Sequence, residues 1–285
     1  MSGRVETIVE CQAEVAKARK AGRRIGFVPT MGGLHEGHLS LVDLAREKSD
    51  WVVLSIFVNP LQFGPGEDFE RYPRDLERDA ELAATRDVNL VFAPSVEEMY
   101  PRPLAARISM QGIVDEFEGA ARPGHFAGVL TVVAKLFHIV APDIAVFGQK
   151  DAQQAAAVRR LVIDLDFPIE ILVAPIVRDE DGVALSSRNV YLTPDERRRA
   201  RSLSRSLEAA SSSFEEGERD ARKVERVVLD VLEGEAGVEV EYAAVLDPDR
   251  FVRIEWIDGP VVVAVAARVG STRLIDNTIL VPNGE

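Results

Sequence analysis

The chain has 285 residues, 46% of them hydrophobic, and a formal net charge of −13 at pH 7. This length and composition are sufficient for one large domain or two smaller ones. The acidic charge argues against general nucleic-acid binding, because a phosphate backbone needs a basic surface, but it leaves room for a local basic pocket that holds a small anion.

The opening segment and the single cysteine bear on where the protein works. The opening "MSGRVETIVECQAEVAKARKAGRR" is charged throughout and contains no apolar signal core. No apolar run is long enough to cross a bilayer, and Cys11 has no second cysteine with which to form a disulfide. We therefore expect a soluble cytoplasmic protein that has no membrane partner.

The first part of the chain alternates between strand and helix patterns. Apolar, β-branched runs predict strands at 24–30, 51–59, 89–93, 144–148 and 169–176. Helical spacing of apolar residues predicts helices at 37–50, 75–86, 127–140 and 151–165. Because strands that alternate with helices form a mostly parallel sheet, we expect an α/β fold with a Rossmann-like domain over residues 1–177.

The pattern changes after residue 177. A Thr cap followed by Pro begins a helical pattern over 193–210, and a second helical pattern follows over 221–233. The stretches "VEVEYAAVLD" and "PVVVAVAARVGSTRLIDN" are strand-like. Helices followed by strands predict a smaller C-terminal α+β domain over 178–285, joined to the first domain by the segment 178–189.

Two of the four histidines, His35 and His38, lie in "FVPTMGGLHEGHLSLVDLA", which begins at Phe27. The pattern of strand, glycine turn and helix is one that binds phosphate, because the helix start offers free N–H groups and a positive dipole end. The glycines would let the backbone approach a ligand closely. Histidines at this spacing share one helix face, so both rings could reach the same phosphates.

Other interpretations of this stretch stay open at this point. It contains neither the GxGxxG of dinucleotide-binding folds nor the GK[ST] of a P-loop. A zinc site would need further ligands, and the segment offers no convincing third one. Both histidines could also do no more than cap a helix or pack at a turn.

The segment resembles the HxGH signature of the nucleotidyltransferase superfamily, whose members transfer a nucleotidyl group from a nucleoside triphosphate. Such enzymes usually carry a second phosphate-binding motif near the end of the Rossmann domain, and "SSRN" at 186–189 stands at that place. Its hydroxyls and planar guanidinium suit phosphate. Seen alone, "SSRN" would be an ordinary surface loop.

Further segments narrow the resemblance. "FVNPLQF" at 57–63, "RPGHFAGVLTVVAKL" at 122–136, "FGQKDAQQ" at 147–154 and "GSTRLIDN" at 270–277 follow in the order found in the pantothenate synthetase (pantoate–β-alanine ligase) family. That family joins D-pantoate to β-alanine through a pantoyl adenylate and releases pyrophosphate and AMP. The resemblance implies pantoate, β-alanine and ATP as partners, Mg²⁺ on the ATP phosphates, a homodimer, and a C-terminal domain that closes as a lid.

The resemblance also implies an ATP site formed by four segments. Its residues would be Met31, Gly32, Gly33, Leu34, His35, Glu36, Gly37 and His38, then Gly148, Gln149, Lys150 and Asp151, then Val177, and finally Leu185, Ser186, Ser187 and Arg188. Among them His38 would be the catalytic residue, with His35 contacting phosphate beside it and Lys150 reaching the phosphates. No side chain is assigned as a direct metal ligand, and Asp151 would either contact the ribose or help to hold the magnesium ion.

Two glutamines would bind the other substrates. Gln62 and Gln154 match the residues that hold pantoate in the family, and Gln62 would also contact β-alanine. An amide suits this task because it can both donate to and accept from hydroxyl and carboxylate oxygens.

Several residues outside this set have simpler interpretations. Asp75 and Asp79, which have helical spacing, would form a solvated face, and Trp51 and Trp256 would lie in the core. His125 could pack against its neighbours or lie near the site.

Two other functions are alternatives to this one. A nucleotidyltransferase that acts on a phosphorylated acceptor would need extra basic residues, and the neutral amides of Gln62 and Gln154 argue against it. A nucleotide sensor without activity would have lost chemical residues, whereas the two histidines, Lys150 and the "SSRN" segment are all present.

Overall fold

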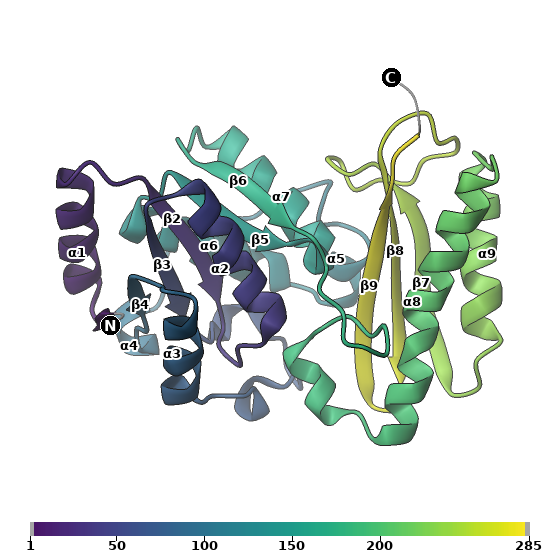
Figure 1. Ribbon diagram of the computed structural model, residues 1–285, viewed down its shortest axis with the longest axis horizontal. Coiled ribbons are helices and arrows are strands. Elements are labelled where there is room, and N and C mark those ends of the chain that lie inside the picture. The colour runs from purple at the N-terminus through teal and green to yellow at the C-terminus, as the bar shows by residue number, and fades with distance from the viewer. Residues whose placement is uncertain (1–2, 283–285) are drawn as a thin grey trace. The chain divides into compact units, whose positions relative to one another are not determined.

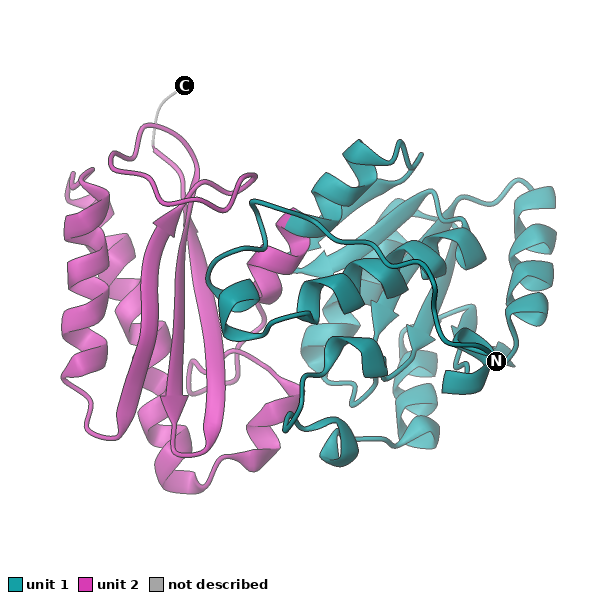
Figure 2. Cartoon of the chain, turned by 180° about the vertical axis from the view of Figure 1, so that it is seen from behind, with its two compact units in different colours: residues 1–148, 157–174 teal, residues 149–156, 175–285 magenta. Residues whose placement is uncertain are grey.

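The structure, a computed structural model, describes residues 3–282. The chain forms two compact units, drawn in different colours in Figure 2. Unit 1 contains the residues up to 148 and 157–174, and unit 2 contains 149–156 and the residues from 175 on. The predicted domains extend to residues 1 and 285, which lie outside the described range, and their boundary after residue 177 stays a prediction.

Unit 1 is built on a six-stranded sheet in which all the paired neighbours run parallel. Its order is β1-β4-β3-β2-β5-β6 (Figure 1). The strands are β1 (Gly3–Val5), β2 (Ile25–Thr30), β3 (Trp51–Ile56), β4 (Leu90–Phe92), β5 (Ile144–Gly148) and β6 (Glu170–Ala174). The predicted α/β fold with a parallel sheet is confirmed.

Helices connect the strands of unit 1, as parallel neighbours require. They are α1 (Ile8–Lys20), α2 (Glu36–Lys48), α3 (Leu76–Thr85), α4 (Val96–Met99), α5 (Glu118–Ala121), α6 (His125–Val140) and α7 (Ala152–Asp164), with short 3₁₀ turns η1 (Pro60–Gln62), η2 (Phe69–Arg71) and η3 (Gln149–Asp151). Adjacent residues in a strand point to opposite faces, and both Phe27 and Val28 of β2 are 0% exposed. The sheet is therefore covered on both of its faces.

The order of the strands reverses around β2. From β2 the chain continues to β3 and β4 on one side of the sheet, and later to β5 and β6 on the other side. In open α/β sheets, ligands bind at the carboxyl ends of the strands near such a switch point. The predicted site segments 31–38 and 57–63 directly follow β2 and β3 in the chain, and the predicted segment 148–151 begins at the last residue of β5.

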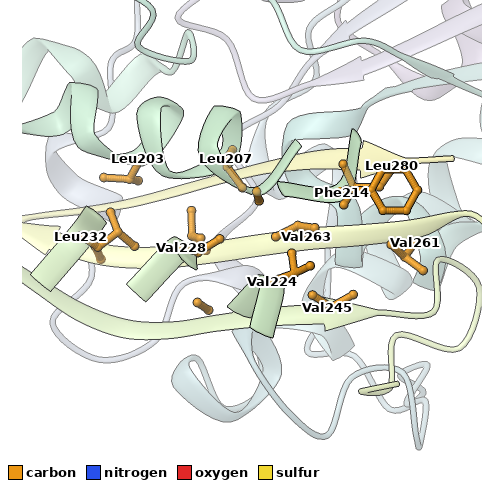
Figure 3. Packing of buried hydrophobic residues seen from close by; sticks show 14 of the residues in the cluster. Leu203, Leu207, Phe214, Val224, Val228, Leu232, Val245, Val261, Val263 and Leu280 are labelled. Carbon is orange, nitrogen blue, oxygen red and sulfur yellow. The ribbon is translucent and has the colours of Figure 1, made fainter. Parts of the chain in front are cut away.

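Unit 2 contains a separate three-stranded antiparallel sheet with the order β7-β8-β9. Its elements are η4 (Ser187–Tyr191), α8 (Pro194–Glu215), α9 (Ala221–Glu233), β7 (Val238–Leu246), β8 (Val261–Val269) and β9 (Thr272–Leu280). Apolar side chains of α8 and α9 pack against the sheet, as Figure 3 shows for Leu207, Val228 and Val263. This core confirms the predicted smaller α+β part of the fold. No helix within residues 3–282 combines the length and apolarity needed to cross a membrane.

Candidate active site

The glycine turn after β2 is closely fitted to its surroundings. The Thr30 hydroxyl donates to the carbonyl of Ser55 on β3 at 2.7 Å and accepts the N–H of Gly32 at 3.3 Å. Gly32 and Gly33 have φ values of 85° and 62°, a region that favours glycine. A Cβ on Gly32 would stand 2.9 Å from Oδ2 of Asp79, so no larger residue fits there without a shift.

Asp79 of α3 binds this turn. Its Oδ2 accepts the N–H of Gly33 and its Oδ1 accepts the N–H of Leu34, both at 2.8 Å. The predicted solvated position of Asp79 is wrong, because its side chain is only 1% exposed. Two charge-assisted hydrogen bonds offset the cost of burying the carboxylate. Together with the N–H of Gly32, which donates to Thr30, three N–H groups of the glycine turn are therefore bound by the protein itself.

The two histidines stand together at the start of α2. His35 is the N-cap with extended backbone, and the N–H of His38 donates to the carbonyl of His35 at 2.8 Å. Their ring centroids are 4.1 Å apart, and the Nδ1 atoms of both rings are buried. The side chain of Glu36 between them is exposed and pairs with Arg86 at 2.8 Å. The pair of imidazole rings is thus the main polar feature of this helix start.

Gln62 in η1 is buried, and both the nitrogen and the oxygen of its side-chain amide have hydrogen-bond partners. Its Nε2 donates to the sulfur of Met31 at 2.8 Å, and its Oε1 accepts Nδ2 of Asn59 at 3.1 Å. Asn59 in turn accepts the Tyr100 hydroxyl at 2.8 Å and donates to the carbonyl of Gly128 at 3.2 Å. Unit 1 therefore brings Gln62 against the residue that begins the glycine turn.

Helix α6 approaches Gln62 closely because it has a glycine at the contact. A Cβ on Gly128 would stand 2.2 Å from the carbonyl oxygen of Leu61 and 2.6 Å from the backbone nitrogen of Gln62. Any larger residue at this position would push the helix away from η1. This close approach is what lets the Gly128 carbonyl accept from Asn59.

His125 and Arg122 bind the backbone of Gln62 from the other side. Nδ1 of His125 lies 2.8 Å from the Gln62 carbonyl oxygen, and Nε2 lies 3.0 Å from the Arg122 guanidinium. Since Arg122 can only donate, this arrangement favours the neutral ring with its proton on Nδ1. Arg122 also makes two bonds of 2.7 Å to Glu67, and these hold the pKa of the Glu67 carboxyl below its usual range.

The segment after β5 belongs to unit 2, where Asn277 of β9 binds it. The Asn277 side chain donates to the carbonyls of Gln149 at 2.9 Å and Lys150 at 3.1 Å, and it accepts the Gln149 amide at 3.1 Å. Asn277 is 2% exposed. Lys150 and Gln154 are half-buried, whereas Asp151 is exposed.

The predicted residues from 177 to 188 form a compact turn in unit 2. The N–H of Leu185 donates to the carbonyl of Val177 at 3.0 Å, and the Ser186 hydroxyl caps η4 by accepting the N–H of Arg188 at 3.3 Å. Arg178 makes a two-pronged ion pair with Asp276, at 2.6 and 3.0 Å. The backbone that carries Ser187 and Arg188 is therefore fixed at both ends.

Comparison with known proteins places this arrangement in a family. The family model for pantoate-beta-alanine ligase matches residues 4–279. The chain belongs to that family. Pantothenate synthetase from Pelotomaculum thermopropionicum is 53% identical over 96% of this chain and 97% of its own length. The same enzyme from Moorella thermoacetica is 54% identical over 98% of this chain and 99% of its own.

Solved structures of family members agree with the fold. Pantothenate synthetase from Thermus thermophilus superimposes with a TM-score of 0.92 at 46% identity, over 97% of this chain and 98% of the other. Pantoate-beta-alanine ligase from Francisella tularensis, solved with beta-gamma ATP and beta-alanine, gives a TM-score of 0.81 at 32% identity, over 98% of both chains.

Sequence patterns alone do not reveal several residues that fix the candidate site segments. The patterns place Asp79 in solvent, contain Asn277 and Asn59 in motifs that give them no role, and leave Tyr100 outside every motif. Each acts on a partner far along the chain, with sequence separations from 41 to 128 residues. No local pattern signals such a contact, although the position of Asn59 after a buried strand was a usable clue.

Proposed function

We propose that the protein catalyses the ATP-dependent condensation of D-pantoate and β-alanine to pantothenate through a pantoyl adenylate. The pantoate carboxylate attacks the α-phosphorus of ATP, and the bond to the β-phosphate breaks to release pyrophosphate. The β-alanine amine then attacks the acyl carbon, loses a proton and displaces AMP. The proposal is carried by the full-length family match, which includes an HxGH turn at the switch point of the sheet.

The ATP site in this proposal consists of the segments that follow β2 and β5 and the turn at 177–188. It includes residues 31–38, Gly148, Gln149, Lys150, Asp151, Val177, Leu185, Ser186, Ser187 and Arg188. The Francisella relative, solved with beta-gamma ATP and beta-alanine, supports a nucleotide as one ligand. Within the turn, Gly33 and Leu34 would shape the site through their backbone conformation. Their N–H groups already donate to Asp79 and would not donate to the phosphates.

The chemistry in this proposal is mainly electrostatic. His38 and His35 donate hydrogen bonds to phosphate oxygens that gain charge as adenylation proceeds, and preorganised donors are most effective at such positions. Lys150 adds a positive charge on the same phosphates. Within residues 3–282, no three His, Cys, Asp or Glu side chains gather to hold a metal ion. In this proposal Mg²⁺ binds the ATP phosphates, as it usually does together with one or two carboxylates, and Asp151 is the candidate carboxylate.

Gln62 and Gln154 bind pantoate in this proposal, and Gln62 also contacts β-alanine. Gln62 suits the role because both ends of its amide already have fixed partners, so its orientation is set before the substrate arrives. A neutral amide can bind the hydroxyl and the carboxylate without requiring a buried counter-charge. We also propose a homodimer that works in the cytoplasm, as the family resemblance implies.

The decisive test is pyrophosphate release from MgATP and D-pantoate, with and without β-alanine. We expect release that depends on pantoate, and formation of AMP and pantothenate only when β-alanine is added. Folded protein that releases no pyrophosphate with pantoate would point to another acceptor or to a nucleotide sensor.

A further inference from the structure

The carboxylate of Asp79 is in an unexpected place for an acidic group. It lies against the turn that we propose to form part of the ATP site, and its side chain is 1% exposed. A negative charge close to a polyphosphate is unfavourable, and low local polarity strengthens that effect. Attraction of the substrate therefore cannot account for Asp79, and its contacts with the protein must do so.

Those contacts are with the most adaptable part of the turn. Gly32 and Gly33 both have positive φ, and glycine loses more conformational freedom on folding than other residues do. Asp79 accepts the N–H groups of Gly33 and Leu34 at 2.8 Å each. The adjacent Arg78 donates to the carbonyl of Leu34 at 3.4 Å. Asp79 and Arg78, which are adjacent on α3, thus bind the N–H and the carbonyl of Leu34, the residue before His35.

We propose that Asp79 is the positioning residue of the HxGH turn. It holds the N–H groups of Gly33 and Leu34 inward, and it thereby fixes where His35 and the start of α2 stand. The nucleotide phosphates then meet the histidine rings and the N–H groups of Glu36 and Gly37, which precede the first bond of the helix, from the His38 N–H to the His35 carbonyl. Asp79 itself does not touch the substrate. This inference rests on the proposed function for the identity of the ligand.

Three substitutions on α3 distinguish the positioning of the glycine turn by Asp79 from a general effect on the stability of the fold. Asp79→Asn keeps the shape, but its NH₂ group would face one backbone N–H, so one of the two hydrogen bonds is lost. Arg78→Ala removes the weaker contact with the Leu34 carbonyl and a 3.9 Å ion pair with Asp79, both made by a side chain that is 56% exposed. It serves if the first variant does not fold. Glu77→Gln is the matched control, because Glu77 is 79% exposed and pairs with Arg4 instead.

The first measurement is amide hydrogen exchange by NMR. In Asp79→Asn we expect the N–H groups of Gly33 and Leu34 to exchange about 10- to 100-fold faster, the factor for losing a hydrogen bond to a charged group. The amides of β2 should keep their protection. Arg78→Ala should show a smaller increase confined to the same turn, and Glu77→Gln should show none. Unchanged exchange at both positions in Asp79→Asn would overturn the inference.

The second measurement is the kinetics of pyrophosphate release. Asp79→Asn should lower kcat/KM for ATP by roughly 10- to 100-fold, as misplaced catalytic groups do, while KM for β-alanine stays unchanged. Equal losses for every substrate would indicate general damage and overturn the positioning role. If the unmodified protein shows no pantoate-dependent release, the proposed function fails, but the exchange measurement still decides whether Asp79 fixes the turn.

Discussion

His35 and His38 place two imidazole rings side by side, with centroids 4.1 Å apart. Two rings at this distance disfavour simultaneous protonation, because like charges repel. Under the proposed function, the pair would offer hydrogen-bond donors to the phosphates from the start of α2, where the backbone of both residues is fixed by the helix.

Replacing His38 with Ala tests the donor. We expect the rate of adenylation to fall by roughly 10²–10³-fold, the scale for losing one preorganised donor to a transition state. Stopped-flow measurement of pyrophosphate release gives this rate directly. His138→Ala is the control, because that histidine is exposed on α6 and packs against Phe167. Unchanged adenylation in folded His38→Ala would contradict the assigned role.

Replacing Gln62 with Ala tests the pantoate site. The substitution removes the amide that we propose to bind pantoate, together with its hydrogen bond to the Met31 sulfur, whereas the histidines and the two contacts of Asp79 with the glycine turn are kept. Pantoate binding should weaken by roughly 10-fold or more, the effect of losing one or two hydrogen bonds, and ATP binding should be nearly intact. Calorimetric titration separates the two affinities. Gln12→Ala, an exposed amide on α1, is the control, and the reverse pattern would contradict the assignment.

At the scale of elements, the segment before η2 is tied to the region between α5 and α6 by one ion pair. Arg122 binds Glu67 through two bonds of 2.7 Å, and both side chains are at most 25% exposed. The hydrogen bond from Arg122 is the largest cause of the lowered pKa of Glu67. A carboxyl with a lowered native pKa stabilises the fold above its unfolded pKa and loses this contribution as the pH falls through the native value.

The resulting prediction concerns stability against pH. At pH 7, Glu67→Gln should lower the free energy of unfolding by about 1 kcal/mol, the scale of a partly buried charged hydrogen bond. The difference from the unmodified protein should persist down to about pH 4.3, the ordinary glutamate pKa, and vanish below it. Denaturant unfolding at several pH values measures this. A difference that grows as the pH falls would contradict the ion-pair explanation.

The sequence patterns predicted most elements because the buried strands and amphipathic helices have clear periods. Helix α1 (Ile8–Lys20) was not predicted, since its charged surface masks a narrow apolar stripe of Cys11, Val15 and Ala18. Its capping box of Thr7 and Glu10 was a usable signal. The strand pattern at 260–277 proved to be two strands, β8 and β9, because the chain turns at Gly270.

The sequence predicts the parts of the candidate site that lie within a local motif. It does not predict the residues that contact those parts from far along the chain. The HxGH turn and Gln62 are visible in short segments. Asp79 is not predicted, because a carboxylate at helical spacing indicates a solvent-exposed position. The sequence pattern does not show the glycine turn that buries this side chain. Trp256 shows the opposite error, since it was expected in the core but is 61% exposed.

At the scale of the whole molecule, unit 2 includes a segment that comes from the middle of the Rossmann-like part of the sequence. Residues 149–156 group with unit 2, whereas the rest of α7 groups with unit 1 (Figure 2). Asn277 makes the hydrogen bonds that hold Gln149 and Lys150 there. The segment that carries Lys150 therefore belongs to a different unit from strand β5, which directly precedes it in the chain.

Asn277→Asp tests the importance of that link. The substitution keeps the shape but replaces two donors by an oxygen that faces the carbonyls of Gln149 and Lys150. We expect kcat/KM for ATP to fall by roughly 10- to 100-fold, because lost bonds of this kind leave buried groups unpaired. Steady-state kinetics measures this, and circular dichroism checks the fold. Ile279→Thr, at a 44% exposed position on β9, is the control, and equal kinetics in both variants would contradict the prediction.

The link between Asn277 and Lys150 also has a consequence for synthesis on the ribosome. The partner of the Lys150 carbonyl is made 127 residues later, which takes roughly 6–25 s at typical rates of translation. Throughout that interval the nascent chain can form most of its parallel sheet, but it cannot complete the segment that carries Lys150. The enzyme therefore acquires its proposed phosphate-binding lysine in working position only near the end of its own translation.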